Sequence, residues 1–310
     1  MSYRALEYAD KYNIVKNRKK FFVISWIILA LGLLSMFTLG LNLGVDFKAG
    51  TRLDMYIGKE FSTTDIDAIV REKLPETSFS DVTAYGEKQA FTRFEETIPP
   101  EKLAEIEQAL IAKYGDQVTK QESTVDPIIA QELVRNAGFA ILFAALGIAI
   151  YVAFRFQFLI GVACAIALLH DVFIPIALFS VFRLEVDLTF IAAILTIVGY
   201  SLNDTIVIFD RIRENERVMK TKTIEDLEHL VNVSLWQTMR RSVFTVVTVL
   251  ATAVAIVFLG SEGIRNFSLV LIFGLLSGSY SSIFIAAQIW VSLKKREMNK
   301  KRFSTAPNES

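Results

Sequence analysis

Six apolar stretches dominate the chain, and each is long enough to cross a lipid bilayer as a helix. A helix that spans the hydrocarbon core needs about 20 residues with few or no charges. The first stretch stands near the start of the chain, and five more follow a long hydrophilic segment. This pattern predicts a membrane α-helical bundle of six transmembrane helices, the last five within residues 136–293. The stretches cover residues 21–41, 136–154, 156–182, 188–209, 242–260 and 267–293.

The hydrophilic segment, residues 42–135, has the alternation of a folded domain. Residues 51–58 carry the period-two apolar pattern of a strand. Residues 62–65 resemble a capping box that opens an amphipathic helix, and a second helix is expected to begin at residues 99–101 and to end at Gly115. With further strands at residues 82–85, 90–95 and 117–123, the order β-α-β-β-α-β predicts a small α+β domain of ferredoxin-like type.

Basic residues predict the orientation, because cytoplasmic segments of membrane proteins are enriched in Lys and Arg. If the N-terminus is cytoplasmic, the inner segments contain twenty Lys and Arg residues, and the short outer loops contain only Arg183 and Arg265. We therefore expect both ends of the chain, residues 1–20 and 294–310, to lie in the cytoplasm. The long insert, residues 42–135, is then extracytoplasmic.

Composition agrees with a membrane protein, with 53% hydrophobic residues and a mean hydropathy of +0.42. The 33 basic residues balance the 33 acidic ones, so charge gives no indication of a nucleic-acid partner, and none is expected. The single cysteine, Cys164, allows no intrachain disulfide. The sequence contains no phosphate-binding loop, dinucleotide fingerprint or zinc motif, so we expect no cofactor and no metal.

A carboxylate lies inside the fourth apolar stretch. Asp204, which follows Asn203, comes six residues before Asp210, where charged residues become frequent. At ~1.5 Å per residue this places Asp204 roughly 9 Å inside the apolar region. A charge at that depth costs about 2.5–3.5 kcal/mol even on the lenient insertion scale. Asp204 must therefore face a partner or water, or be protonated.

A polar face runs along the fifth apolar stretch, where Arg241, Thr245, Thr248 and Thr252 recur at helical spacing. In one interpretation this face points into the helix bundle, and Arg241 lies near Asp204. The other leaves Arg241 at the cytoplasmic surface and the threonines bonded to their own helix. An aspartate that loses an arginine neighbour takes up a proton, so such a pair could couple ion flow to movement. A static ion pair is the alternative, and sodium would suit the aspartate as well as a proton.

His170 and Asp171 interrupt the third apolar stretch. Adjacent residues on a helix point about 100° apart, and no motif places a nucleophile beside them, so enzymatic activity is not expected. The pair is interpreted as a contact between helices or as part of a proton path. In the sixth stretch Gly274, Gly278 and Ser282 follow a four-residue spacing, which predicts close helix packing.

Several of these segments together resemble the SecD/SecF family, whose members form an accessory complex of the Sec protein translocation channel. The most specific is GYSLNDTIVIFDRIREN at residues 199–215. The family's turn motif is matched by GVDFKAG at residues 44–50, with Asp46, Phe47 and Gly50, although Ala49 stands where the family usually has glycine. Further matches are LHDV at residues 169–172, QTMRRS at residues 237–242 and GSYSSIF at residues 278–284.

The resemblance implies a six-helix half of a resistance-nodulation-division type membrane fold, in the cytoplasmic membrane of a prokaryote. The implied partners are a separate SecD-like subunit, the Sec channel, an unfolded preprotein and membrane lipid. Asp204 matches the family's membrane aspartate and Arg241 its arginine partner, with Asn203 beside the aspartate, and both charged residues are tied to proton-driven function. The extracytoplasmic domain would help hold and pull the emerging preprotein with the proton motive force.

Two other functions stay open at this point. A proton-coupled transporter of lipids or small molecules would use the same fold and the same acid, since fold does not determine cargo. The single hydrophilic segment leaves little room for a cargo pocket, which disfavours that function. A structural scaffold of the translocon is the second alternative, and in that case neutralising Asp204 would change assembly or nothing.

Overall fold

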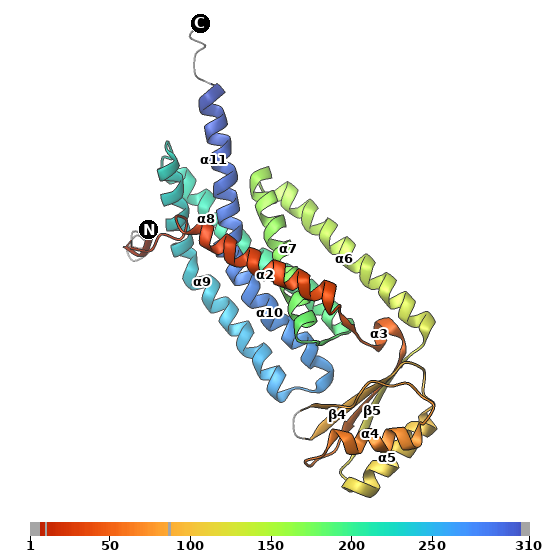
Figure 1. Cartoon of the computed structure of the whole chain (residues 1–310). Helices are drawn as coiled ribbons and strands as arrows, with labels where there is room; N and C mark the ends of the chain where they lie inside the picture. Colours follow the sequence, from red (N-terminus) through yellow and green to blue (C-terminus); the bar gives the residue numbers. More distant parts are fainter. Residues whose placement is uncertain (1–6, 10, 86–87, 305–310) are drawn as a thin grey trace. The chain divides into compact units, whose positions relative to one another are not determined.

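The computed structural model describes residues 7–9, 11–85 and 88–304, and these form two compact units (Figure 1). The domain unit comprises Leu43–Ala140. The helical unit comprises the described residues that precede Leu43 and those from Ile141 onward. Helix α6 passes from one unit into the other.

Within the described residues, six helical segments are long and apolar enough to cross a membrane, which confirms the six-helix prediction. Helices α6, α8 and α9 are longer than the apolar stretches because their polar ends continue the helix. The last span is interrupted by a π-helical turn, Ser282–Ala286, between α10 and α11. The long helices are α2 (Arg18–Thr38), α6 (Pro127–Arg155), α7 (Phe158–Val181), α8 (Leu188–Val218), α9 (Ile224–Leu259), α10 (Arg265–Ser281) and α11 (Ala287–Ser304). Short elements are β1 (Asn42–Leu43), α3 (Val45–Lys48), β6 (Glu185–Val186) and the 3₁₀ turn η1 (Glu262–Ile264).

The domain unit is an antiparallel sheet in the order β3-β4-β2-β5, with α4 and α5 sharing its core. Leu53 and Met55 of the central strand are buried against Ile66 of α4 and Ile106 of α5. This strand order, with the connection β-α-β-β-α-β, is the ferredoxin-like arrangement that the sequence predicts. The elements are β2 (Gly50–Tyr56), α4 (Thr63–Lys73), β3 (Thr83–Tyr85), β4 (Gln89–Phe94), α5 (Pro100–Tyr114) and β5 (Thr119–Val125).

The capping box predicted at residues 62–65 is wrong, although a helix does begin there. Within the described residues the Ser62 side chain caps no backbone N–H, and its hydroxyl lies 2.6 Å from that of Thr64. Asp65, which would reach back in a capping box, lies 3.1 Å from the Lys113 ammonium of α5. The ion pair with the neighbouring helix therefore replaces the local hydrogen bond.

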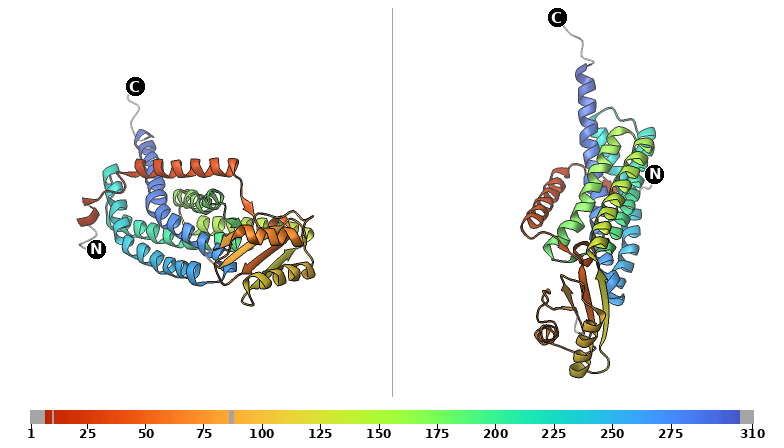
Figure 2. Two further views of the ribbon diagram at one scale, coloured as in Figure 1. Left: turned by 60° about the horizontal axis from the view of Figure 1, so that its bottom comes forward. Right: turned by 90° about the vertical axis from the view of Figure 1, so that its right-hand side faces the viewer.

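Helix α10 lies at the centre of the helical unit, where it packs against α7, α8 and α9. A Cβ added at Gly274 would stand 2.1 Å from Ile197 of α8, and one at Gly278 would stand 3.1 Å from Ser201. The two glycines thus allow α8 and α10 to approach closely, which confirms the predicted close-packing helix. Helix α2 lies along α7 on the outside of this group (Figure 2).

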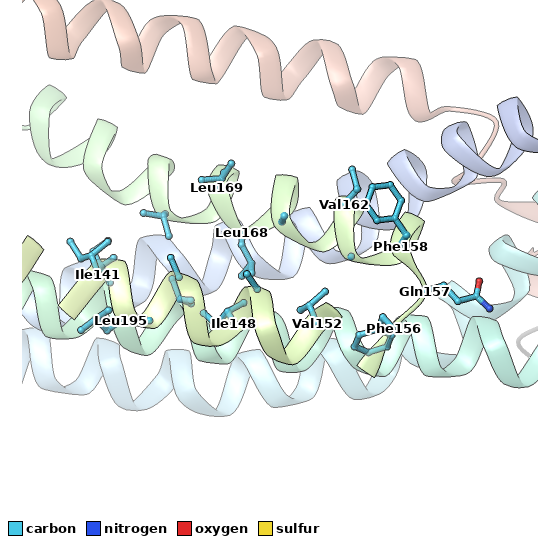
Figure 3. A pocket seen from close by; sticks show the side chains of 18 residues that line it. Ile141, Ile148, Val152, Phe156, Gln157, Phe158, Val162, Leu168, Leu169 and Leu195 are labelled. Atoms are coloured by element: carbon cyan, nitrogen blue, oxygen red, sulfur yellow. The ribbon is translucent and has the colours of Figure 1, made fainter. Parts of the chain in front are cut away.

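An apolar cavity of about 600 Å³ lies between α6, α7 and α8 (Figure 3). Side chains such as Ile148, Val152 and Leu168 form its walls. Gln157 is its one polar side chain among the described residues, and none of the lining residues is ionisable.

Candidate functional site

Asp204 is buried inside helix α8, with 7% of its surface exposed. The helix begins at the N-cap Asp187, whose carboxylate accepts a hydrogen bond from Phe190 N at 2.8 Å. Ser242 of α9 donates its hydroxyl to Asp204 Oδ1 at 2.6 Å. Asp204 Oδ2 is also buried, and no described residue forms a hydrogen bond with it. The carboxyl group thus has one oxygen bound by a hydroxyl and one buried oxygen with no described hydrogen-bond partner.

Ser242, and not Arg241, occupies the position against Asp204. Adjacent residues on a helix point about 100° apart, so turning Ser242 toward α8 turns Arg241 away from it. Arg241 is exposed on the surface of α9, and within the described chain it forms no ion pair with Asp204.

The threonines of the predicted polar face bond to their own helix. Thr245 donates to Arg241 O at 2.8 Å, and Thr248 donates to Thr245 O at 2.8 Å. Thr252 continues the pattern by donating to Thr248 O at 3.0 Å. Thr245, Thr248 and Thr252 are exposed, as is Asn203 beside Asp204. The polar face of α9 therefore lies on the outside of this chain rather than in its interior.

His170 and Asp171 of α7 lie in a second buried polar cluster. Asp171 is fully buried and lies within hydrogen-bond distance of the hydroxyl of Ser201 in α8. Ser277 and Ser281 of α10 also donate to it. One turn beyond Ser201, the hydroxyls of Thr205 and Ser282 lie 2.8 Å apart, at the start of the π-helical turn.

Several partners in these clusters were not singled out from the sequence. Ser242, Ser201 and Thr205 each stand in an apolar stretch, where a single hydroxyl is common and usually bonds to its own helix. The signal that could have identified them is their spacing from Asp204 and Arg241. Ser201 and Thr205 lie within one helical turn of the aspartate, and Ser242 follows the arginine directly.

Comparison with known proteins places these residues in a family. The sequence profile of "Protein export membrane protein SecD/SecF, C-terminal" matches residues 105–296, and that of the SecD/SecF GG motif matches residues 34–55. The chain belongs to the SecD/SecF family. The first profile includes Asp204, Arg241 and the Asp171 cluster, and the second includes Ala49 and Gly50.

Named relatives cover almost all of the chain. It is 42% identical to the protein translocase subunit SecF of Alicyclobacillus acidocaldarius, over 94% of this chain and 95% of that protein. It is also 42% identical to the protein translocase subunit SecDF of Bacillus subtilis, but it spans 39% of the length of that relative. The crystal structure of SecDF from Thermus thermophilus, a translocon-associated membrane protein, matches 92% of this chain with a TM-score of 0.81 and 33% identity. A SecDF structure in a super-membrane-facing form matches with a TM-score of 0.68 and 30% identity.

The GG motif of the SecD/SecF family forms the turn between α3 and β2. Gly50 has a φ of +110°, and a Cβ there would stand 2.1 Å from Phe94 O, so only glycine fits. Ala49 has a φ of +67° and a ψ of 174°, a combination that glycine adopts readily and alanine does not. Asp46 and Phe47 lie in the short helix α3, and both are half-buried.

Proposed function

We propose that the chain is the SecF-type subunit of a SecDF accessory complex, which uses the proton motive force to promote preprotein export through the Sec channel. In this proposal it lies in the inner membrane with both termini in the cytoplasm and the domain unit outside. The names of its relatives and the likeness to SecDF structures support the assignment. A transporter of lipids or small molecules has no comparable support.

Proton coupling is inferred from the unequal environments of the two Asp204 oxygens. A buried carboxylate oxygen without a donor is unfavourable in the interior of a membrane bundle. Protonation relieves this, because a neutral carboxyl group loses much of the penalty for leaving water. A cation that moves next to the charged carboxylate reduces this energetic penalty as well. Asp204 can therefore alternate between a protonated state and a charged state that requires a cationic neighbour.

Arg241 is the residue that supplies this cation. It immediately precedes Ser242, so a rotation of α9 against α8 would exchange the Ser242 hydroxyl for the Arg241 guanidinium at the carboxyl group. The charged Asp204 then favours one position of α9, and the protonated Asp204 favours the other. Proton entry and release thus move a helix, and this movement would be transmitted to the extracytoplasmic domain that holds the preprotein.

The test is export of a secreted reporter by cells whose copy of this chain carries Asp204→Asn or Arg241→Met. Each variant should slow export several-fold, because neither can alternate between the two states. Glu214→Gln is the matched control, since Glu214 lies on the same helix in an exposed pair with Arg211. It should export at the parental rate. Normal export by both variants, with the SecD-like partner still co-purifying, would rule out coupling through this pair.

A further inference from the structure

The cluster around Asp171 joins three helices through one carboxyl group. Ser201 of α8 and Ser281 of α10 donate to Oδ2 at 2.5 and 2.6 Å. Ser277 of α10 donates to Oδ1 at 3.0 Å, and His170 Nδ1 lies 3.1 Å from the same oxygen. A carboxylate has about four acceptor sites, and here each oxygen has two neighbours. Hydroxyls at 2.5–2.7 Å are typical of donors to an ionised carboxylate.

This arrangement favours one tautomer of His170. Beside an ionised carboxylate, which only accepts hydrogen bonds, Nδ1 carries the hydrogen that faces Asp171. The other ring nitrogen, Nε2, is buried and has no hydrogen-bond partner among the described residues. His170 as a whole is 7% exposed, and its ring stacks on Tyr280 with centroids 6.2 Å apart. Nε2 is thus an unsatisfied polar atom that is free to accept a proton.

Few other ionisable groups face the cluster. From α10 the ring of Tyr280 lies on His170, and its hydroxyl donates to Phe21 O at 3.0 Å. The α2 residues after Lys20 are uncharged and include no titratable side chain. Tyr200 and Asp204 are the ionisable residues of α8 nearest in sequence to Ser201, and Asp204 accepts a hydrogen bond from Ser242 of α9. His170 is therefore the basic group that compensates the Asp171 charge.

The cluster is also connected to the Asp204 region. Ser201 lies three residues before Asp204 on α8, which is about one helical turn. Ser281 precedes Ser282, whose hydroxyl meets Thr205, the residue after Asp204. A Cβ at Gly278 would stand 3.3 Å from Ser201 Oγ, so the approach of α10 to this hydroxyl depends on glycine. Asp171 thus contacts, through Ser201, the segment of α8 that holds Asp204.

We propose that His170 and Asp171 form a second site that takes up and releases protons in the helical unit, with His170 Nε2 as the exchanging atom. Protonation of Nε2 gives an imidazolium paired with the Asp171 carboxylate, and loss of that proton leaves the carboxylate without a counter-charge. Asp171 is a positioning residue: it holds α8 and α10 against α7, and the strength of that hold depends on the proton at His170. The proposal deepens the proposed function and rests on Asp204 as the primary coupling site.

The test uses nitrogen NMR of the full chain in lipid nanodiscs. The chain contains two histidines, and His229 is exposed on α9, so His229→Gln leaves His170 as the single reporter. With ¹⁵N-labelled histidine, Nδ1 should be protonated throughout the titration, and Nε2 should gain and lose a proton. This measurement requires no change in the cluster. A His170 that carries its neutral-state hydrogen on Nε2, or that does not titrate, would overturn the proposal.

Variants then test the role of Asp171. In Asp171→Asn the preference of the His170 ring for hydrogen on Nδ1 should weaken, because an ionised carboxylate that only accepts is replaced by an amide that can also donate. Ser279→Ala is the control, since the Ser279 hydroxyl is exposed and donates to Leu276 O of its own helix. It should leave the tautomer unchanged. An unchanged tautomer in a folded Asp171→Asn variant would contradict the role assigned to Asp171.

Export measurements distinguish this site from the primary one. Ser201→Ala should slow reporter export, because it removes the hydroxyl that links Asp171 to α8. Export at the parental rate by this variant would contradict the proposed link between Asp171 and α8. If cells with Asp204→Asn export the reporter at the parental rate, the proposed function is wrong. The NMR result for His170 does not depend on that outcome.

Discussion

At the scale of single residues, the chemistry depends on which hydroxyl meets which carboxyl oxygen. Ser242 is fully buried, and its hydroxyl is the described hydrogen-bond partner of Asp204. In a medium of low dielectric constant this bond is worth more than it would be in water. Ser242 therefore stabilises the packing of α9 against α8 in the state that the structure shows.

Ser242→Ala should lower the free energy of unfolding by about 1–3 kcal/mol, because it leaves both Asp204 oxygens without a partner in a buried site. Thr252→Val is the control, since the Thr252 hydroxyl is exposed and bonds to carbonyls of its own helix. It should change stability little. Reversible denaturation in mixed micelles measures both variants, and equal stabilities would contradict the role assigned to Ser242.

The sequence was sufficient to identify Asp204 but not its partner. A carboxylate inside an apolar span is unfavourable in any fold, so its importance follows from the sequence alone. Which side of α9 meets α8 depends on packing between helices. The regular spacing of Arg241, Thr245 and Thr248 indicated a common face, but a spacing does not determine whether that face points inward or outward.

At the scale of elements, the turn between α3 and β2 holds backbone strain. Ala49 occupies a backbone region that is essentially restricted to glycine, and Gly50 follows at a φ of +110°. The second glycine is required by the close contact with Phe94 O. No such close contact explains the alanine, and the family motif that matches this segment is described as a GG motif.

Ala49→Gly should raise the free energy of unfolding of the domain unit by about 1 kcal/mol, because it removes this strain. The opposite change, Ala112→Gly, lies on the exposed side of α5 and should lower it by a similar amount. Hydrogen exchange of the β2 amides in the full chain measures both effects. If Ala49→Gly accelerated this exchange, the interpretation of the turn would be wrong.

Element types were easier to predict than element ends. Strand β2 and helix α5 follow from apolar periodicity, which the buried core imposes directly. Helix α9 begins well before its apolar stretch, at a capping box in which Thr223 and Asp226 each bond the other's backbone N–H. Residues 62–65 carry a similar pattern without the bonds, because Lys113 competes for the Asp65 carboxylate.

At the scale of the whole molecule, the outward polar face of α9 is the feature that a single chain does not explain. Arginine and threonine side chains on a membrane-spanning surface usually face a partner or a water-filled path. The chain spans 39% of the length of a SecDF relative. We infer that the face formed by Arg241, Thr245, Thr248 and Thr252 contacts the SecD-like subunit.

A photo-cross-linker attached to Thr248→Cys should capture the SecD-like subunit in membranes. The native cysteine, Cys164, is buried and is replaced by alanine in this experiment. The same label at Val246→Cys, which points into the helical unit, should capture much less partner. Equal capture from both positions, or none from residue 248 when the partner co-purifies, would contradict the assignment of this face.

We propose that protonation of Asp204 drives export, and inverted membrane vesicles that contain the complex and the Sec channel allow this claim to be measured. The late stage of preprotein translocation is timed with and without an imposed proton gradient. The gradient should accelerate this stage in parental vesicles, and Asp204→Asn should abolish the acceleration while translocation without a gradient stays the same. Acceleration of Asp204→Asn vesicles to the parental extent, with equal partner content, would contradict the claim.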